Sequence, residues 1–323
     1  MKKRRGGSAV RVIALTLLGA LAFFPFLFMV MTSFKSIPEF YRNYWLPSVS
    51  PHWVNYAEAW REIDQYLVNS VIVSTVSVVG VVLLSSLTAF ALGRMRFRGR
   101  QFLYYGIIAV LMIPPILTLV PTFMVVKSID ISIPAGEWAR EVPVLQRLVD
   151  ERPPEAPRVA EAVGFLARWY AGASCHLRIR LLDTLWALIL PYIAGGQAFS
   201  VFVLTTFFRN MPGDLFDSAG IDGATRRQQY WHLALPLGKP VLGTVAIMTT
   251  LGTWNNFIWP LVTISTPSRS VITTGLLMFG SEYGGRYGAM AAGQVLASLP
   301  LLVMFLLTTR MFLRGMTAGA FKM

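Results

Sequence analysis

The sequence contains little charge, a single cysteine and only three histidines. Charged residues make up 14% of its 323 positions and hydrophobic residues 54%, a balance outside the range of soluble globular domains. Cys175 has no partner within the chain, and the cysteine and histidines form no cluster with metal-ligand spacing. We therefore predict no internal disulfide and no metal site, and the composition predicts a membrane protein.

Six apolar runs contain no Asp, Glu, Lys, Arg or His. At 1.5 Å per residue, runs of about 19 to 25 residues can each cross about 30 Å of hydrocarbon, whereas a soluble core rarely needs six of them. We predict an all-α membrane protein with six transmembrane helices. The runs lie at about 12–34, 69–93, 102–126, 184–207, 240–264 and 291–309.

The first run also has features of a signal peptide. Basic residues at positions 2–5 precede it, and Ala20-Leu21-Ala22 mimics a cleavage site. The apolar stretch continues to Met31, well beyond that site. An uncleaved membrane span is therefore expected.

The charges predict the orientation of the spans. If the N-terminus is cytoplasmic, the inner segments hold 16 of the 29 Lys and Arg residues but only three of the 16 acidic residues. The inner side then carries the whole net charge of +13, as the positive-inside rule expects. Both termini should be cytoplasmic in a multi-pass protein of the cell membrane, and the basic pI needs no nucleic-acid partner.

The chain divides into three parts on this topology. Residues 1–127 hold spans one to three, and residues 184–323 hold spans four to six with an inner loop at 208–239. Residues 128–183 carry many charges of both signs, and two stretches at about 137–150 and 158–170 are typical of amphipathic helices. We predict that this segment is an inserted helical lobe on the outer face.

Ionisable groups are missing from the six runs. An ion-coupled carrier usually holds its ion with such groups at membrane depth, so this class is disfavoured, although sodium coupling through carbonyls and hydroxyls stays open. Neutral amides remain as candidates for a substrate pathway, and Trp254 lies beside two of them. The candidates are Gln197, Asn255 and Asn256.

Sequence motifs for nucleotide chemistry are also missing. The only Gly-Lys pair, Gly238-Lys239, is followed by proline and has Leu233 where a P-loop requires glycine. No nucleophile elbow and no His-Glu-x-x-His motif occurs. If the protein uses ATP, another chain must bind it.

The inner loop predicts two short helices. Asp214 is expected to cap the first, at about 215–222, and Gly223 to turn the chain. Thr225 and Gln228 form a capping box for the second helix, and Pro236 should limit its extension. The loop is too apolar for a solvated turn, so we expect it to present side chains to a partner. These are Leu215, Phe216, Ile221, Tyr230 and Trp231.

This loop resembles the inner loop of the membrane subunits of ABC importers. That loop reads Glu-Ala-Ala, three residues, Gly, nine residues, Ile-x-Leu-Pro. Here the same spacing falls on Asp217-Ser218-Ala219, Gly223, Leu233 and Leu235-Pro236, with Asp, Ser and Leu as conservative departures. The following Asp222-Gly223-Ala224-Thr225, the Trp254 to Phe257 segment and the chain end at 314–320 are similar to the carbohydrate branch, in particular to the smaller membrane subunits of maltose transporters.

The resemblance implies a type I importer fold and a permease that is not itself an enzyme. It implies three partners: a second membrane subunit, an ATPase dimer that holds ATP and Mg, and an extracytoplasmic solute-binding protein. The coupling residues would be Asp217, Ser218, Ala219, Asp222, Gly223, Leu235 and Pro236. A sugar is the expected solute. A peptide or amino-acid importer, an ion-coupled carrier and a membrane-embedded glycosyltransferase are the alternatives.

Overall fold

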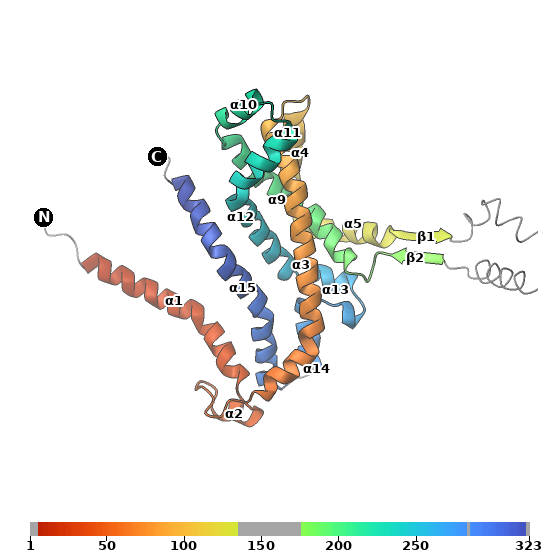
Figure 1. The fold of residues 1–323 in the computed structure, drawn as a ribbon. Coiled ribbons are helices and arrows are strands. Elements are labelled where there is room, and N and C mark those ends of the chain that lie inside the picture. The colour runs from red at the N-terminus through yellow and green to blue at the C-terminus, as the bar shows by residue number, and fades with distance from the viewer. Residues whose placement is uncertain (1–5, 135–175, 283–284, 321–323) are drawn as a thin grey trace, which may run out of the picture.

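The computed structural model describes residues 6–134, 176–282 and 285–320, which fold into a bundle of long helices (Figure 1). Helix α3 packs against α9, α12, α14 and α15. Five helices are long and apolar enough to cross a membrane, and the bent pair α4 and α5 can supply a sixth span. The predicted six-helix membrane fold is confirmed. The spans are α1 (Gly6–Ser33), α3 (Val54–Arg94), α4 (Arg100–Leu111) with α5 (Pro115–Ser128), α9 (Trp186–Asn210), α12 (Leu235–Trp254) and α15 (Tyr287–Ala320).

Helix α3 extends well beyond the predicted run at 69–93. Its 41 residues would span about 61 Å, roughly twice the hydrocarbon thickness. The extra turns at 54–68 contain charged residues but no proline or glycine, so nothing in the local sequence ends the helix. Helix α14 (Ile272–Glu282) packs against α3, and Ile272 and Phe279 share a hydrophobic cluster with Ala59 and Ile63 of the added turns. Helix α2 (Ile37–Arg42) lies near the start of α3 (Figure 1).

Prolines break two of the predicted runs. Helices α4 and α5 meet at an angle of 102° next to Pro114 and Pro115. The fifth run is interrupted at residues 255–257, before the short helix α13 (Ile258–Thr263). Pro260 has no N–H for the carbonyl of Asn256 and its ring would clash there. The Thr273 hydroxyl donates to that carbonyl instead, at 2.9 Å.

Another proline lies inside α9. Pro191 cannot donate to the carbonyl of Ala187, four residues earlier. The indole N–H of Trp259 on α13 donates to that carbonyl at 3.0 Å. Proline thus leaves an acceptor free on α9, and a side chain from a different helix uses it.

Two antiparallel strands begin and end the inserted segment, where only helix had been predicted. Strand β1 (Asp130–Pro134) pairs with β2 (His176–Arg180), with Asp130 opposite Arg180 and Pro134 opposite His176. Both strands alternate polar and branched apolar residues, which is the period of a strand. The helices predicted at 137–150 and 158–170, and most of the predicted lobe, lie outside the described residues.

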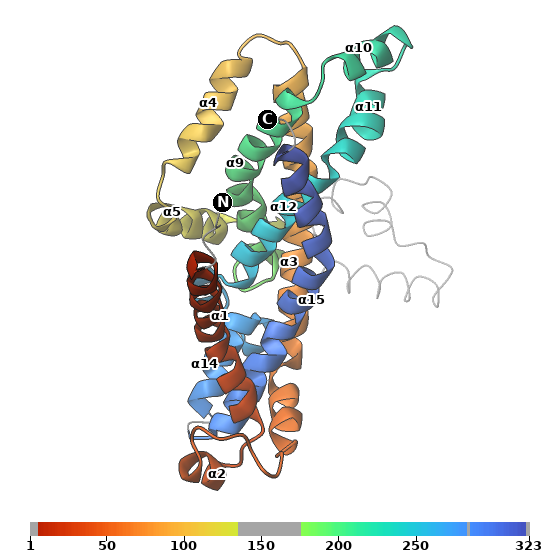
Figure 2. The same cartoon turned by 90° about the vertical axis from the view of Figure 1, so that its left-hand side faces the viewer.

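One end of the bundle carries α10 (Asp214–Ile221) and α11 (Arg226–Gln229), next to the turn between α3 and α4. The opposite end carries α2, and α14 lies toward it (Figures 1 and 2). A turn of 3₁₀ helix, η2 (Pro267–Arg269), joins α13 to α14. We refer to these as the α10 end and the α2 end.

Asp183 joins the start of α9 to the η2 segment. It adopts a positive φ of 62°, and its carboxylate accepts hydrogen bonds from the amides of Ser265 and Thr266, both at 2.9 Å, and from the Thr266 hydroxyl at 2.6 Å. Arg269 donates to the Asp183 carbonyl and lies 3.5 Å from its carboxylate. Partial burial opposes ionisation, but the hydrogen bonds and Arg269 together lower the pKa of Asp183.

Buried side-chain amides fasten other segments near the α2 end. The Asn55 amide donates to the carbonyls of Ser33 and Lys35, at 2.8 and 2.9 Å. A side chain at Gly288 would collide with the same Lys35 carbonyl and with Asn55, so α15 passes close to this joint. Asn69 donates in the same way to the carbonyls of Ser268 and Ser270, both at 2.9 Å.

Candidate functional site

The predicted coupling loop, residues 208–239, starts with the last residues of α9 and continues into α10. Gly213 occupies the N-cap position and supplies no side-chain hydrogen bond. Asp214 is the first residue of the helix, so the prediction that it is the cap was wrong. Its carboxylate and that of Asp217 lie in the first turn, where the helix dipole favours negative charge.

Gly223 turns the chain between the two short helices. Its φ is +81°, a region that residues with a side chain rarely adopt, and no atom lies within 4 Å of where a Cβ would be. The backbone conformation, and not a lack of space, therefore requires glycine. The amides of Gly223 and Ala224 donate to the carbonyls of Gly220 and Ala219, at 3.1 and 2.9 Å, and close the end of α10.

The predicted capping box begins α11. The Gln228 amide donates to the Thr225 hydroxyl at 3.3 Å, and the Thr225 amide donates to the Gln228 side chain at 2.8 Å. Both bonds satisfy N–H groups that the first turn of a helix leaves free. The start of the second helix is therefore specified by its own sequence.

Pro236 does not end the helical path, contrary to the prediction. A π turn at Tyr230–Ala234 follows α11, and the Leu235 amide donates to the carbonyl of Tyr230, five residues earlier. The wider turn shifts the hydrogen-bond register just before Pro236, which lies in the first turn of α12, the part of a helix that tolerates proline. The coupling loop therefore continues directly into a membrane-spanning helix.

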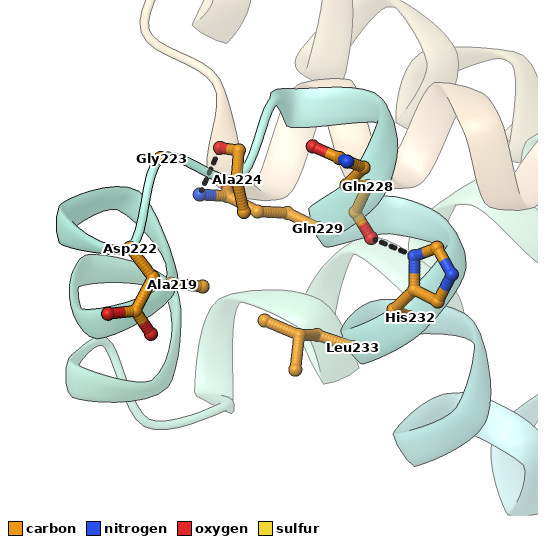
Figure 3. A pocket seen from close by; sticks show the side chains of 8 residues that line it. All are labelled: Ala219, Asp222, Gly223, Ala224, Gln228, Gln229, His232 and Leu233. Atoms are coloured by element: carbon orange, nitrogen blue, oxygen red, sulfur yellow. Dashed lines mark hydrogen bonds between the residues drawn. The ribbon is translucent and has the colours of Figure 1, made fainter.

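A hollow of about 310 Å³ lies between α10 and the second helical segment (Figure 3). Gln229 is buried beside it, and its amide donates to the carbonyls of Phe216 at 3.2 Å and Ala224 at 3.5 Å. This side chain braces the two helices, and the motif spacing alone did not single it out. The residues around the hollow are Ala219, Asp222, Gly223, Ala224, Gln228, Gln229, His232 and Leu233.

The predicted coupling residues fall into two groups. Ala219, Asp222 and Gly223 line the hollow, while Asp217 and Ser218 lie exposed on α10 nearby. Leu235 and Pro236 belong to the start of α12 and do not line it. The structure therefore brings five of the seven residues together on α10 and its turn.

Three of the five apolar residues expected to face a partner are exposed. Ile221 is 87% exposed, Leu215 42% and Trp231 49%. Phe216 and Tyr230 are buried, because they pack with Phe90 and Phe208 in the core of this chain. The expectation for those two side chains was wrong, since sequence alone does not say which face of a short helix meets the bundle.

The predicted pathway amides lie on two helical segments. Asn255 is exposed at the C-terminal end of α12, and the Asn256 side chain accepts the backbone N–H of Trp259 at 3.2 Å. Gln197 on α9 donates to the carbonyl of Ile193 in its own helix, at 3.0 Å. Asn256 thus binds the first turn of α13, whose N-cap residue is Phe257.

Among residues 6–134, 176–282 and 285–320, no group of three or more His, Cys, Asp or Glu side chains lies close enough to hold a metal ion. The polar groups near the α12–α13 break are amides, hydroxyls and backbone groups. Such groups bind neutral hydroxyl-rich molecules through hydrogen bonds.

Comparison with known proteins finds relatives that are permease proteins of transport systems. The diacetylchitobiose uptake system permease protein NgcG of Streptomyces coelicolor is 29% identical over 321 residues, covering 98% of this chain and 89% of that protein. The arabinooligosaccharides transport system permease protein AraQ of Halalkalibacterium halodurans is 27% identical over 316 residues, covering 96% and 95%. A solved bacterial ABC transporter involved in alginate import has a similar fold, with a TM-score of 0.70 at 16% identity over 96% of this chain and 98% of that one.

The family match covers the region that contains the coupling loop. It extends over residues 81–314, from the C-terminal half of α3 to the last turns of α15. The chain belongs to the family of binding-protein-dependent transport system inner membrane components.

Proposed function

We propose that the chain is a permease subunit of an ATP-driven, binding-protein-dependent importer of a sugar or oligosaccharide, and that it forms half of the translocation pathway. Family membership supports the importer, and the solutes named for the relatives support the sugar. The observation that carries the proposal is the coupling loop at the α10 end, which exposes Leu215, Ile221 and Trp231 beside the family motif.

In this function the coupling loop docks on an ATPase subunit, and Ile221 buries its exposed side chain there. ATP and Mg bind the ATPase dimer, and this chain supplies no phosphoryl chemistry. A second permease subunit completes the pathway, and an extracytoplasmic binding protein delivers solute. Nucleotide binding favours one of two states of the bundle because it closes the ATPase dimer, and the docked loops transmit that closure.

The charge distribution supports the orientation. The α10 end carries the basic turn at 94–101 and the arginines of α11, so it is assigned to the cytoplasm. Both termini are then cytoplasmic, and the α2 end faces the binding protein. Gene fusions that report the side of the N-terminus test this assignment.

The break at residues 255–257 is assigned to the pathway, together with Gln197. Non-helical backbone at membrane depth is tolerated where it is buried in protein or lines a watery cavity, and Asn255 is exposed on this chain. Asn255→Ala should therefore change the preference among sugars in uptake assays. Asn256→Ala is the matched comparison, because it removes the neighbouring side-chain amide and, in addition, the hydrogen bond that Asn256 accepts from the Trp259 backbone N–H. If Asn255→Ala lowers the amount of protein but leaves the preference among sugars unchanged, the role of Asn255 is packing.

Co-purification tests the importer as a whole. An ATPase should co-purify with the chain. If the ATPase no longer co-purifies with the Ile221→Asp variant, the contact lies at Ile221. A thermal-shift screen of the binding protein with diacetylchitobiose, arabinooligosaccharides, peptides and amino acids then identifies the solute class. A response only to peptides or amino acids would overturn the sugar assignment. Uptake driven by an ion gradient without an ATPase would overturn the whole proposal.

A further inference from the structure

Two arginines bridge the α10 ends of α3 and α9. Arg94, the last residue of α3, donates to the carbonyl of Met211 just after α9. Arg209, in the last turn of α9, donates to the carbonyl of Leu92 on α3 at 3.5 Å. Each cation lies at the C-terminal end of a helix, where free carbonyls and the helix dipole favour it.

The two arginines differ in the second group that they contact. The guanidinium carbon of Arg94 lies 4.3 Å from the centre of the Phe216 ring on α10. That of Arg209 lies 4.2 Å from the centre of the Tyr104 ring on α4. Cation–π contacts of this kind are attractive at partly desolvated sites. Arg94 therefore joins α3 to the coupling loop, whereas Arg209 joins α9 to α4.

Tyr230 makes a second connection from the coupling loop to α3. It is the first residue of the π turn and is 3% exposed. Its hydroxyl lies 2.8 Å from that of Ser86 on α3. Ser86 donates its own proton to the carbonyl of Leu83 at 3.0 Å, so Tyr230 is the donor to Ser86.

An aromatic ring of α3 fills the space between these connections. Phe90 lies 5.3 Å from the Tyr230 ring and 6.4 Å from the Phe216 ring, measured between centroids. Tyr230 and Phe216 come from different helices of the coupling loop, and both pack on this one side chain. The loop is therefore attached to α3 at two points with a packed ring between them, an arrangement that resists sliding and rotation.

We propose that Arg94 and Tyr230 are positioning residues that make the coupling loop and the inner half of α3 move as one body. The inference rests on the proposed function, because it assigns the path by which a docked ATPase moves the bundle. Displacement of α10 pulls on Arg94 through Phe216, and displacement of the π turn pulls on Ser86 through Tyr230. Helix α3 then carries the motion to α9, α12 and α15, which pack against it.

The test uses the complete transporter in lipid vesicles, with both permease subunits, the ATPase subunits and the binding protein. Two rates are measured: ATP hydrolysis, and uptake of whichever probe the thermal-shift screen selects from diacetylchitobiose and arabinooligosaccharides. The variants are Tyr230→Phe, Ser86→Ala, their combination, and Arg94→Gln. Arg209→Gln is the matched control, since Arg209 also caps a neighbouring helix but contacts α4 instead of the loop.

Tyr230→Phe keeps the ring and removes only the hydroxyl, so the fold should persist. Sugar taken up per ATP hydrolysed should fall about three- to tenfold, the range expected for one buried hydrogen bond. The double variant should be no worse than either single variant, because all three lack the same bond. Arg94→Gln should lower the same ratio, and Arg209→Gln should leave it unchanged. A purely structural role would lower the amount of complex but not this ratio.

Suppose that the wild type couples normally and that Tyr230→Phe and Arg94→Gln take up as much sugar per ATP as the wild type. That result would overturn this inference but leave the proposed function intact. An equal fall in Arg209→Gln would also overturn it, because the loop contact would then not be special. Failure of the wild-type chain to bind an ATPase would overturn the proposed function and this inference together.

Discussion

At the α10 end, rings and guanidinium groups join the helices, whereas near the α2 end side-chain amides and a carboxylate do so. Phe90, Phe216 and Tyr230 pack on one another between α3 and the coupling loop. Asn69 and Asp183 instead bind backbone groups of residues 265–270. The packed rings at the α10 end resist sliding between α3 and the loop, whereas the hydrogen bonds of Asn69 and Asp183 hold backbone segments in one geometry. The α10 end is suited to move as a unit, and the α2 end to hold segments in fixed places.

The largest effect is expected from breaking the coupling loop itself. Gly223→Val forces a β-branched residue into a positive φ, which costs at least about 1–2 kcal/mol. Binding-protein-stimulated ATP hydrolysis should fall at least about 5- to 30-fold, while sugar binding by the isolated binding protein persists. Gly223→Asn should retain more activity, because asparagine tolerates this conformation and the site has open space.

Gly220→Ala is the control for that variant. It adds a methyl group within α10, where the nearest atom would be the Gln229 amide nitrogen at 3.8 Å. It should hydrolyse ATP like the wild type. Normal stimulation in Gly223→Val would remove the assignment of this loop, and an unfolded chain would reduce Gly223 to an ordinary turn residue.

A smaller effect is expected near the α2 end from Asp183→Ala. The change removes the acceptor for two amides and a hydroxyl and places alanine at a φ of 62°. We expect a loss of about 1–3 kcal/mol in stability, seen as a lower thermal unfolding temperature of the purified complex. Asp183→Asn keeps one acceptor oxygen and should lose less. Equal losses in both variants would mean that charge, not geometry, matters there.

Replacing residues 131–180 by a short flexible linker tests what the inserted segment adds to transport. No membrane helix is removed, so the spans and the ATPase contact should remain. If the segment guides the binding protein, transport should need several times more binding protein for half-maximal rate and should depend less on salt, since exposed charges mainly affect association rate. An unchanged requirement would leave the segment without a docking role, and loss of the complex would place it in the core fold.

The smallest effect concerns pH. The lowered pKa of Asp183 means that its stabilising contribution is complete above its ordinary value of 3.8 and is lost as pH falls through the lower folded value. The unfolding temperature of the wild type should therefore fall, as the pH is lowered below about 4, by more than that of Asp183→Asn. Parallel curves for the two proteins would show that other carboxylates govern the acid response.

Sequence reasoning succeeded where a feature depends on neighbouring residues. Hydrophobic length predicted the spans, and the Thr225–Gln228 box and the Gly223 turn follow local rules. It failed where distant segments decide. The break at 255–257 depends on Thr273 as a donor to a released carbonyl, and the burial of Phe216 depends on the position of Phe90. The π turn also escaped prediction, because its extra residue is accommodated by packing on α3.

The prolines at 191 and 260 have a consequence for assembly in the bilayer. Each removes the backbone donor that would pair with the carbonyl four residues earlier, at Ala187 and Asn256, and lipid offers no water to replace it. A helix inserted alone would bear that cost until Trp259 or Thr273 arrived from another part of the chain. The unsatisfied acceptor then makes helix association selective, because it favours a neighbour that presents a matching donor. Residues usually regarded as helix breakers would in this way select which helices pair.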